Sequence, residues 1–212
     1  MTARRLESVS ALEEFGRERL SPSFFMREFL YSEVSNRDGK PNIPDDPDLA
    51  IEVGRMLCET LLEPLNATFG RIAVRSAYRS ASLNSYCNEM AKQKKAGYSC
   101  AENDKDFAGH IWDRRDSEGL RGAMACIVIP WFADRCAQAA DWRSFAYWIH
   151  DHLPYSELEF FPKLCAFNIS WHDKPKKNIN SYIDPKGYLL RDARAESGFG
   201  MRYADFAALK LQ

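Results

Sequence analysis

The sequence predicts an α+β fold, and three patterns carry this prediction. Apolar residues recur at helical spacing in several segments, the longest of which runs from Leu49 to Leu65. Short and almost fully apolar runs separate these segments, and the clearest extends from Ala123 to Pro130. Helix and strand patterns follow one another without a βαβ repeat. We therefore expect one α+β domain over residues 21–212, preceded by an arm or short helix over residues 1–20.

The composition is that of an ordinary folded protein. The 212 residues carry 29 Lys and Arg against 30 Asp and Glu, so the net charge is −1, and 45% of them are hydrophobic. Disordered chains combine low hydrophobicity with high net charge, and this chain has neither property. A net charge near zero provides no overall attraction to nucleic acid or anionic lipid, so neither nucleic acid nor a membrane is an expected partner. The sequence also lacks the ~18 consecutive apolar residues of a membrane span.

The N-terminal segment and the cysteines both bear on location. Residues 1–7 begin with basic character, but no apolar core follows, and residues 12–16 interrupt any signal-peptide pattern. We therefore expect a cytoplasmic protein with reduced thiols. None of the six cysteines forms a CxxC pair, which argues against a zinc ribbon or a thioredoxin-like motif. Most of them are expected to be small buried residues: Cys58, Cys87, Cys100, Cys126, Cys136 and Cys165.

The first third of the chain is predicted to contain two helices. Ser21 begins a helix that carries apolar residues as far as Ser32, and a polar loop rich in turn-forming residues follows over 36–42. Acidic residues over 45–48 favour the start of a longer helix, because the N-terminal end of the helix dipole attracts negative charge. We expect Pro64 to kink the last turn of this helix and the following glycine, at position 70, to end it.

The middle of the chain alternates short strands with helices. A strand is predicted over 72–74, and a helix capped by its first serine is predicted over 80–95. The apolar strand over 123–130 and a helix over 142–152 follow. Residues 97–121 form a long polar segment without a clear period, which indicates a functional or mobile loop.

The C-terminal part is predicted to contain a hairpin and a last helix. Apolar runs over 158–161 and 164–171 flank the pair Pro162-Lys163, which suits an antiparallel hairpin. A helix over about 204–211 then closes the chain.

One ordered series of motifs is similar to a known family. The series consists of Leu62-Glu63-Pro64-Leu65, Phe69-Gly70, a short strand, Ser76-Ala77-Tyr78-Arg79-Ser80 and Leu83-Asn84. In this order the motifs resemble peptidase family M15, the zinc D-Ala-D-Ala carboxypeptidases and peptidoglycan endopeptidases of the Hedgehog/DD-peptidase fold, with Ala77 in place of the family's glycine. The resemblance extends over about residues 22–172 and implies a small antiparallel sheet flanked by helices.

The zinc-ligand positions of this family are altered in the present sequence. Where the family motif Ser-x-His-x-x-Gly-x-Ala-x-Asp supplies a histidine and an aspartate, an alignment on the apolar strand finds Gly119 and Cys126, and Asn168 matches the third ligand, a histidine. Glycine has no donor atom, and a neutral carboxamide is a poor zinc ligand. Without the metal, water keeps a pKa near ~15.7, so this alignment implies that the peptidase activity is lost. Three residues lie near the position of the family's general base: Glu157, Glu159 and Phe161.

A second alignment keeps a metal site. If residues 108–110 take the role of Ser-x-His, His110, Asp116 and Cys126 are candidate ligands of a rearranged zinc site, and Asp113 can replace Asp116. The chain would then be an active zinc metallopeptidase, a D,D- or L,D-carboxypeptidase or endopeptidase acting on peptidoglycan-type peptides. A third hypothesis makes His110 and Asp113 an acid–base pair that serves another reaction.

Arg79 is the candidate substrate-binding residue. In family M15 the arginine of this motif faces the substrate, and a guanidinium matches a carboxylate through two parallel hydrogen bonds. Ser76, Tyr78 and Asn168 are predicted to contact the same ligand. An equally open alternative is that Arg79 and Ser76 brace the turn between strand and helix.

The leading hypothesis is a non-catalytic binding or regulatory module that has kept the cleft of family M15. Such a module would bind a peptide or a small carboxylate and need no cofactor, whereas the alternative enzyme would need zinc. Structural roles stay open for the same residues: a hydrogen-bonded surface residue in a polar loop for His110, a self-paired charge cluster for 113–116, and a place in the core for Cys126.

Overall fold

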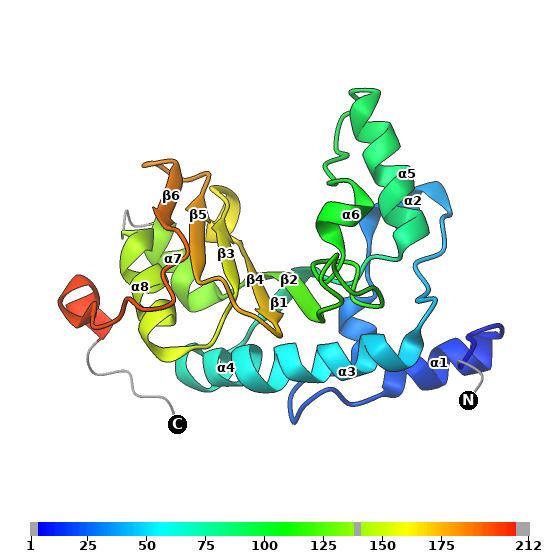
Figure 1. Ribbon diagram of the computed structural model, residues 1–212, viewed down its shortest axis with the longest axis horizontal. Helices are drawn as coiled ribbons and strands as arrows, with labels where there is room; N and C mark the ends of the chain where they lie inside the picture. Colours follow the sequence, from blue (N-terminus) through cyan, green and yellow to red (C-terminus); the bar gives the residue numbers. More distant parts are fainter. Residues whose placement is uncertain (1–3, 138–140, 207–212) are drawn as a thin grey trace. The chain divides into compact units, whose positions relative to one another are not determined.

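The computed structural model describes residues 4–137 and 141–206, and it confirms the α+β class. Helices accompany a six-stranded mixed sheet with the strand order β1-β2-β4-β3-β5-β6 (Figure 1). The chain divides into two compact units: unit 1 holds Met1–Arg55 and Ser76–Ala125, and unit 2 holds Met56–Arg75 and Cys126–Gln212. The boundaries fall inside a helix and inside strands β1 and β2, where no turn signal or change in composition marks them. A single domain over 21–212 stays a prediction.

Unit 1 is built mostly of helices. The helix over Val9–Arg17 confirms the helical option for the N-terminal arm, and the serine before Ala81 caps its helix as predicted, because its hydroxyl accepts a hydrogen bond from the Leu83 N–H at 3.2 Å. The elements are α1 (Val9–Arg17), a 3-10 helix (Met26–Phe29), α2 (Glu33–Asp38), the greater part of α3 (Pro47–Leu57), α5 (Ala81–Lys92), α6 (Asn103–Asp106) and the first half of β2 (Gly122–Val128).

The helix predicted from Ser21 to Ser32 is wrong. Only the 3-10 helix Met26–Phe29 forms there, and the helix α2 (Glu33–Asp38) begins after Ser32 and extends into the loop predicted over 36–42. The Ser32 hydroxyl accepts from the N–H of Ser35, and Gly39 ends α2 with a left-handed φ of 62°. Phe24 and Phe29 are buried, whereas Phe25 is exposed, so part of the apolar pattern reflects the core and not a helical period.

The long helix and its interruption are confirmed. A π-helical turn over Cys58–Leu62 follows α3 directly and leads into α4 (Glu63–Phe69). Pro64 lies in the first turn of α4, a position where proline is tolerated although it has no backbone N–H. Gly70 ends α4 at φ 83°, a backbone conformation that favours glycine.

Unit 2 packs two helices against a sheet. The Phe132 ring of α7 stacks on Phe145 of α8 at 4.1 Å, and Phe145 meets Phe167 of β4 edge-on at 5.6 Å. Phe167 in turn stacks on Phe160 of β3 at 5.1 Å, so aromatic side chains join both helices to the sheet. The elements are α4, β1 (Ala73–Ser76), the second half of β2, α7 (Pro130–Ala137), α8 (Trp142–His152), β3 (Glu157–Phe160), β4 (Phe167–His172), β5 (Asn178–Ser181), β6 (Gly187–Leu190) and 3-10 helices over Lys163–Cys165 and Gly200–Phe206.

The predicted hairpin is confirmed, but the sheet is not purely antiparallel. Strands β3 and β4 are antiparallel, with Leu158 opposite Ile169, whereas β5 pairs with β3 in parallel, with Leu158 also opposite Ile179. Strand β4 ends beside the start of β3, so the short link over 173–177 brings the chain to the other edge of β3 at that same end. Strand β5 must then run in the direction of β3.

The prediction of reduced thiols is wrong for four cysteines. Cys87 is bonded to Cys100 and Cys136 to Cys165, across Cα–Cα distances of 5.7 Å and 6.4 Å that suit a disulfide. Cys58 and Cys126 are buried, as predicted, and neither forms a disulfide with a described residue. Signal-peptide patterns bear on the compartment, whereas pairing depends on which side chains the fold brings together.

Two further predictions concern the last helix and membrane-spanning segments. The last helix, predicted over 204–211, falls mostly outside them, and the 3-10 helix Gly200–Phe206 occupies its start. Among the helices of the described ranges, none combines the length and the apolar character needed to cross a bilayer.

Candidate functional site

The Tyr-Arg-Ser motif is held by two backbone connections. The Arg79 N–H donates to the His110 carbonyl at 2.8 Å, which ties the motif to the polar segment 97–121. Asn42 holds the same turn from the other side, because its amide donates to the Tyr78 carbonyl at 3.0 Å and its Oδ1 accepts from the Ser80 N–H at 2.8 Å. Asn42 therefore braces the turn, the role that one of the two open alternatives gave to Arg79 and Ser76.

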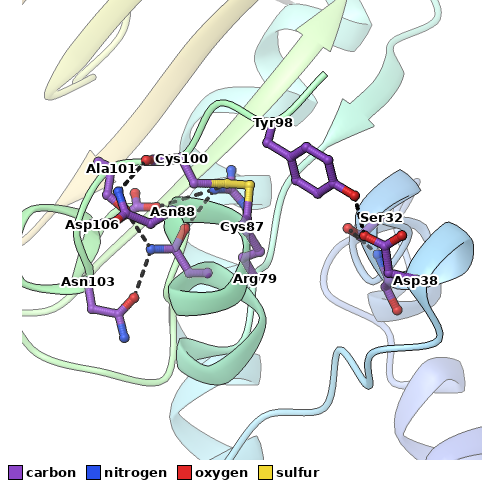
Figure 2. Close-up of a disulfide and its surroundings, with 12 residues drawn as sticks. Ser32, Asp38, Arg79, Cys87, Asn88, Tyr98, Cys100, Ala101, Asn103 and Asp106 are labelled. Carbon is purple, nitrogen blue, oxygen red and sulfur yellow. Dashed lines mark hydrogen bonds and ion pairs between the residues drawn. A yellow bond between two sulfur atoms is a disulfide. The ribbon is translucent and has the colours of Figure 1, made fainter. Parts of the chain in front are cut away.

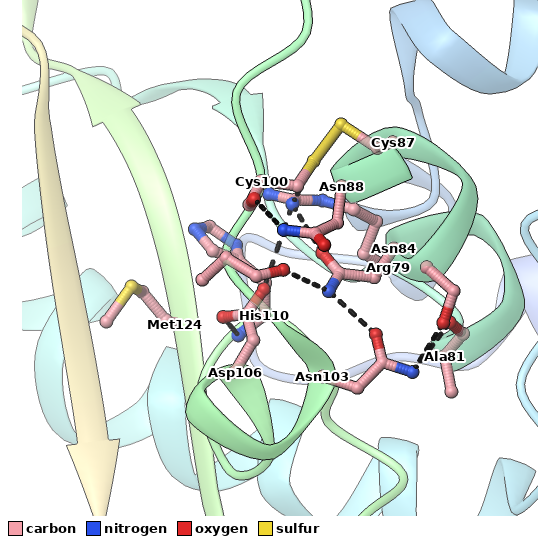
Figure 3. Close-up of polar contacts among 12 residues, drawn as sticks. Arg79, Ala81, Asn84, Cys87, Asn88, Cys100, Asn103, Asp106, His110 and Met124 are labelled. Atoms are coloured by element: carbon pink, nitrogen blue, oxygen red, sulfur yellow. Dashed lines mark hydrogen bonds and ion pairs between the residues drawn. A yellow bond between two sulfur atoms is a disulfide. The ribbon is translucent and has the colours of Figure 1, made fainter. Parts of the chain in front are cut away.

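The Arg79 guanidinium is anchored through one nitrogen. Its Nη1 donates to Asn84 Oδ1 at 2.7 Å, lies 2.8 Å from Cys100 Sγ and stands 3.7 Å from Asp106 Oδ2 (Figure 3). Nε and Nη2 form no hydrogen bond to any residue that the structure describes. The side chain is 15% exposed, and burial lowers its pKa while Asp106 opposes that shift. The guanidinium thus stays a cation, and its edge formed by Nε and Nη2 has no hydrogen-bond partner among the described residues.

Asparagines of α5 and its partner loop position these groups. Asn84 donates through Nδ2 to the Ala101 carbonyl at 3.0 Å and to Asn103 Oδ1 at 2.8 Å, and Asn88 donates to the Cys100 carbonyl at 2.8 Å (Figure 3). These amides connect α5 to the start of α6. The segment predicted to be functional or mobile is therefore tied to a helix at its first third.

His110 is buried and held in one tautomer. Its Nδ1 lies 2.7 Å from the Ala77 carbonyl, which can only accept, so Nδ1 carries the proton and Nε2 carries the lone pair. Burial, followed by the charge of Arg79, lowers the pKa of His110, and Asp106 opposes the shift. Across the described chain Nε2 has no hydrogen-bond partner. The residue is a neutral base with one free acceptor, not the surface residue of the structural alternative.

Asp106 contacts both Arg79 and His110, and it was not among the site residues predicted from the sequence. Its Oδ1 accepts the His110 backbone N–H at 3.0 Å, and its Oδ2 is the one that approaches Arg79. A Cβ on Gly109 would lie 2.9 Å from Oδ1, so this approach requires glycine. The sequence signal was present in the acidic residue four positions before His110, within the loop already singled out.

Asp113 does not form a pair with His110. Its Oδ2 accepts the backbone N–H of Asp45 at 2.7 Å and of Asp46 at 3.3 Å, at the start of α3. Its Oδ1 and the Tyr78 hydroxyl are both buried and have no hydrogen-bond partner among the residues that the structure describes. Burial, followed by the charge of Asp113, raises the pKa of Tyr78, and burial raises that of Asp113. Both side chains belong to the core of unit 1.

The predicted ligand contact of Tyr78 is not supported by its position. The residue is 1% exposed, and its ring meets Trp112 edge-on at 6.1 Å. Ser76 ends β1 and makes no side-chain hydrogen bond to a described residue. Of the unit 1 residues expected to contact a ligand, only Arg79 combines a charged group with uncommitted donors.

Asp116 closes a turn. Its Oδ1 accepts the backbone N–H groups of Glu118 and Leu120, each at 2.9 Å, and Gly119 takes a φ of 78° in the same turn. The cluster over 113–116 is not self-paired, because Arg114 forms its ion pair with Asp45 at 2.7 Å. Its charges bind other parts of unit 1.

The two candidate site residues in unit 2, Cys126 and Asn168, also contact other side chains of the protein. Cys126 is buried in β2, and its sulfur lies 4.0 Å from Arg75 Nη1. Asn168 uses its amide as a donor, to Glu159 Oε2 at 3.1 Å on the neighbouring strand. Burial raises the pKa of Glu159, and the Asn168 amide opposes this shift. The position matched to a zinc-binding histidine therefore holds a hydrogen-bond donor.

The residues predicted to hold zinc do not fit that ion. Within the described residues, no three His, Cys, Asp or Glu side chains are grouped so that they could hold a metal. The carboxylates of Asp113 and Asp116 are already bound to backbone N–H groups, and releasing them would undo the start of α3 and a turn.

No protein-family model, curated protein or solved structure matches this chain. The resemblance to family M15 therefore depends on the sequence motifs alone.

Proposed function

We propose that this chain is a non-catalytic binding module related to peptidase family M15, and that it binds the free carboxylate of a peptide or of a small acid at Arg79. One observation carries the proposal: Arg79 is anchored through Nη1 alone, which leaves its Nε–Nη2 edge without a partner among the described residues. A carboxylate matches this edge through two parallel hydrogen bonds.

The surroundings prepare the guanidinium for such a ligand. Asn84 and Asp106 hold it in one orientation, so little side-chain entropy is lost when a ligand binds. Hydrogen bonds to charged groups contribute about 1.5–3 kcal/mol each, and partial burial places this pair at the upper end. The neutral His110 supplies an acceptor at Nε2 beside the cation. A carboxylate followed by an amide N–H, as at the C-terminus of a peptide, complements both groups.

The absence of catalysis is inferred from the donor atoms. The aligned zinc positions carry Gly119, Cys126 and Asn168, and Asn168 donates its amide to Glu159. An amide that serves as a donor to a carboxylate does not replace a metal-binding imidazole. The active zinc peptidase stays the alternative, and it would require Asp116 to leave its turn.

A matched pair of ligands tests the proposal. We expect N-acetyl-D-alanyl-D-alanine to bind in a calorimetric titration, and its C-terminal amide to bind at least about tenfold more weakly, because the amide lacks the anion. Arg79→Ala should remove binding, and Arg79→Lys should weaken it, because an ammonium cannot form two parallel bonds. Arg5→Ala, at an arginine whose side chain is 80% exposed, is the control.

Two results would count against the proposal. Equal affinities for the acid and the amide would show that the carboxylate is not recognised. Release of D-alanine from the same peptide after zinc is added, abolished by His110→Ala, would favour the metallopeptidase instead.

A further inference from the structure

The disulfide of unit 1 touches the proposed carboxylate site. Cys87 comes from α5 and is 1% exposed, and Cys100 comes from the loop that leads to α6 (Figure 2). The Cys100 sulfur lies 2.8 Å from Arg79 Nη1, the nitrogen that anchors the guanidinium. Any change in the charge of this sulfur therefore acts directly on the cation that the site depends on.

The loop around Cys100 is also held by bonds other than the disulfide. The Asn88 amide donates to the Cys100 carbonyl at 2.8 Å, and the Asn84 amide donates to the Ala101 carbonyl at 3.0 Å. Further back in the loop, the Tyr98 hydroxyl donates to Asp38 at 2.5 Å (Figure 2). These contacts keep Cys100 beside Arg79 when the S–S bond is absent.

Reduction changes the chemistry of this contact. A dithiol reductant supplies two electrons and two protons, the S–S bond breaks, Cys87 and Cys100 become thiols, and the reductant becomes a disulfide. The Cys100 thiol then loses its proton to solvent, because an adjacent guanidinium stabilises the thiolate. A neutral, weakly accepting sulfur is thereby replaced by an anion.

Reduction then makes the net charge around Arg79 unfavourable for an anionic ligand. In the oxidised state the positive Arg79 faces the negative Asp106, and the sum is zero. A thiolate on Cys100 adds one negative charge and takes the guanidinium as its own partner. We propose that the Cys87–Cys100 disulfide is a redox switch, such that the oxidised protein binds carboxylates at Arg79 and the reduced protein releases them. This inference rests on the proposed function.

Two single variants separate the thiolate from the lost cross-link. Both Cys87→Ser and Cys100→Ser remove the disulfide, but only Cys87→Ser keeps a thiol beside Arg79. In the full chain, titrated with N-acetyl-D-alanyl-D-alanine at pH 8, we expect Cys87→Ser to bind at least about tenfold more weakly than the oxidised wild type. We expect Cys100→Ser to bind within about threefold of it. Equal losses in the two variants, or no loss in either, would overturn the switch.

The second disulfide needs its own control. A reductant also opens Cys136–Cys165, so the titration with and without dithiothreitol is repeated in the double variant Cys136→Ser/Cys165→Ser. Reduction should weaken binding in this variant as in the wild type. A reduction effect that disappears with the second disulfide would assign the sensitivity to unit 2 and overturn the inference.

A readout without ligand distinguishes failure of the switch from failure of the proposed function. In Cys87→Ser, the rate of alkylation of Cys100 by iodoacetamide against pH reports the thiol pKa, and mass spectrometry separates this cysteine from the thiols of Cys58 and Cys126. Adding Arg79→Ala should raise that pKa by at least about one unit. An unchanged pKa would overturn the switch even if the oxidised protein binds the peptide. A raised pKa together with no binding by the oxidised wild type would overturn the proposed function alone.

Discussion

Two buried histidines, one in each unit, use their nitrogens in opposite ways. His150 of α8 has both ring nitrogens occupied, because Nδ1 accepts from the Tyr155 hydroxyl at 2.7 Å and Nε2 donates to the Glu196 carbonyl at 3.0 Å. His110 has one nitrogen bonded to Ala77 and one without a partner in the described chain. A histidine with no spare atom joins elements together, whereas one with a spare acceptor can serve a ligand.

Asp151 near His150 and Asp106 near His110 also use their oxygens in different ways. Asp151 accepts from the Gly198 and Phe199 N–H groups at 3.0 and 2.6 Å and from the Tyr203 hydroxyl at 2.9 Å, which fastens the segment 196–206 to α8. Asp106 instead divides its oxygens between the His110 backbone and a buried cation. The polar groups of unit 2 hold the segment 196–206, which includes the 3-10 helix Gly200–Phe206, in place. Those of unit 1 hold a cation in a defined orientation.

The largest expected effect comes from removing these two aspartates. Asp106→Ala leaves the buried guanidinium of Arg79 without its counter-charge, and breaking a buried pair costs about 3–5 kcal/mol. Asp151→Ala loses hydrogen bonds at a half-buried position and should cost about 1–3 kcal/mol. Urea denaturation of both variants measures the difference. Equal costs would remove the distinction between the two regions.

A smaller effect is expected from two glycines. Gly109→Ala places a Cβ 2.9 Å from Asp106 Oδ1 and 3.0 Å from its backbone oxygen, so the free energy of unfolding should fall by about 1–3 kcal/mol. Gly200→Ala, whose Cβ would meet only the Tyr203 hydroxyl at 3.9 Å, should change it by less than about 0.5 kcal/mol. Thermal unfolding of the pair checks this. A tolerated Gly109→Ala would show that Asp106 need not lie so close.

The two histidines also predict a dependence on pH. Burial lowers the pKa of both His110 and His150 below the ordinary value of 6.5. Between the lowered values and 6.5, the unfolded chain therefore binds protons that the folded chain does not bind. Their contribution to stability is complete above about pH 6.5 and is lost as the pH falls through the lowered folded values. Each contributes a slope of at most about 1.4 kcal/mol per pH unit in that window.

Matched variants assign the slope. His110→Gln should flatten the dependence of the unfolding free energy on pH below 6.5 more than His150→Gln. At His110 the Arg79 cation adds to the lowering of the pKa by burial, whereas at His150 the hydrogen bond to the Glu196 carbonyl opposes that lowering. Urea titrations at several pH values measure both. A larger effect of His150→Gln would contradict the assignment of the buried neutral base to unit 1.

The smallest expected effect is at the edge of unit 2. Burial, followed by the hydrogen bond to Asp151, raises the pKa of Tyr203 to about 12, so its hydroxyl stays a donor. Tyr203→Phe removes one hydrogen bond and should lower the unfolding free energy by about 0.5–1.5 kcal/mol. Binding of N-acetyl-D-alanyl-D-alanine should be unchanged. Weaker binding would mean that the segment 196–206 also serves the ligand site.

Patterns that act over a few residues were predicted well. The helix over Trp142–His152, the capped helix α5 and the interruption before Pro64 agree with the structure, because capping, dipole and proline effects are local. Two predictions failed where the local pattern allowed more than one structure. The region before Ser32 forms only a short 3-10 helix, with Phe29 buried and Phe25 exposed, and strands β5 and β6 were missed because they are short and half exposed.

The site shows the same division between local pattern and tertiary contact. The sequence by itself pointed to Arg79 and His110, because a strand–arginine–helix motif and a histidine in a long polar loop are visible in one dimension. It could not show that Asp106 lies between them, that Asp113 and Asp116 bind backbone N–H groups, or that Cys100 reaches Cys87. Residue types determine which atoms can donate, accept or carry charge. Which of these atoms find a partner, and which stay available to a ligand, is decided by contacts between distant parts of the chain, and only the folded backbone brings those parts together.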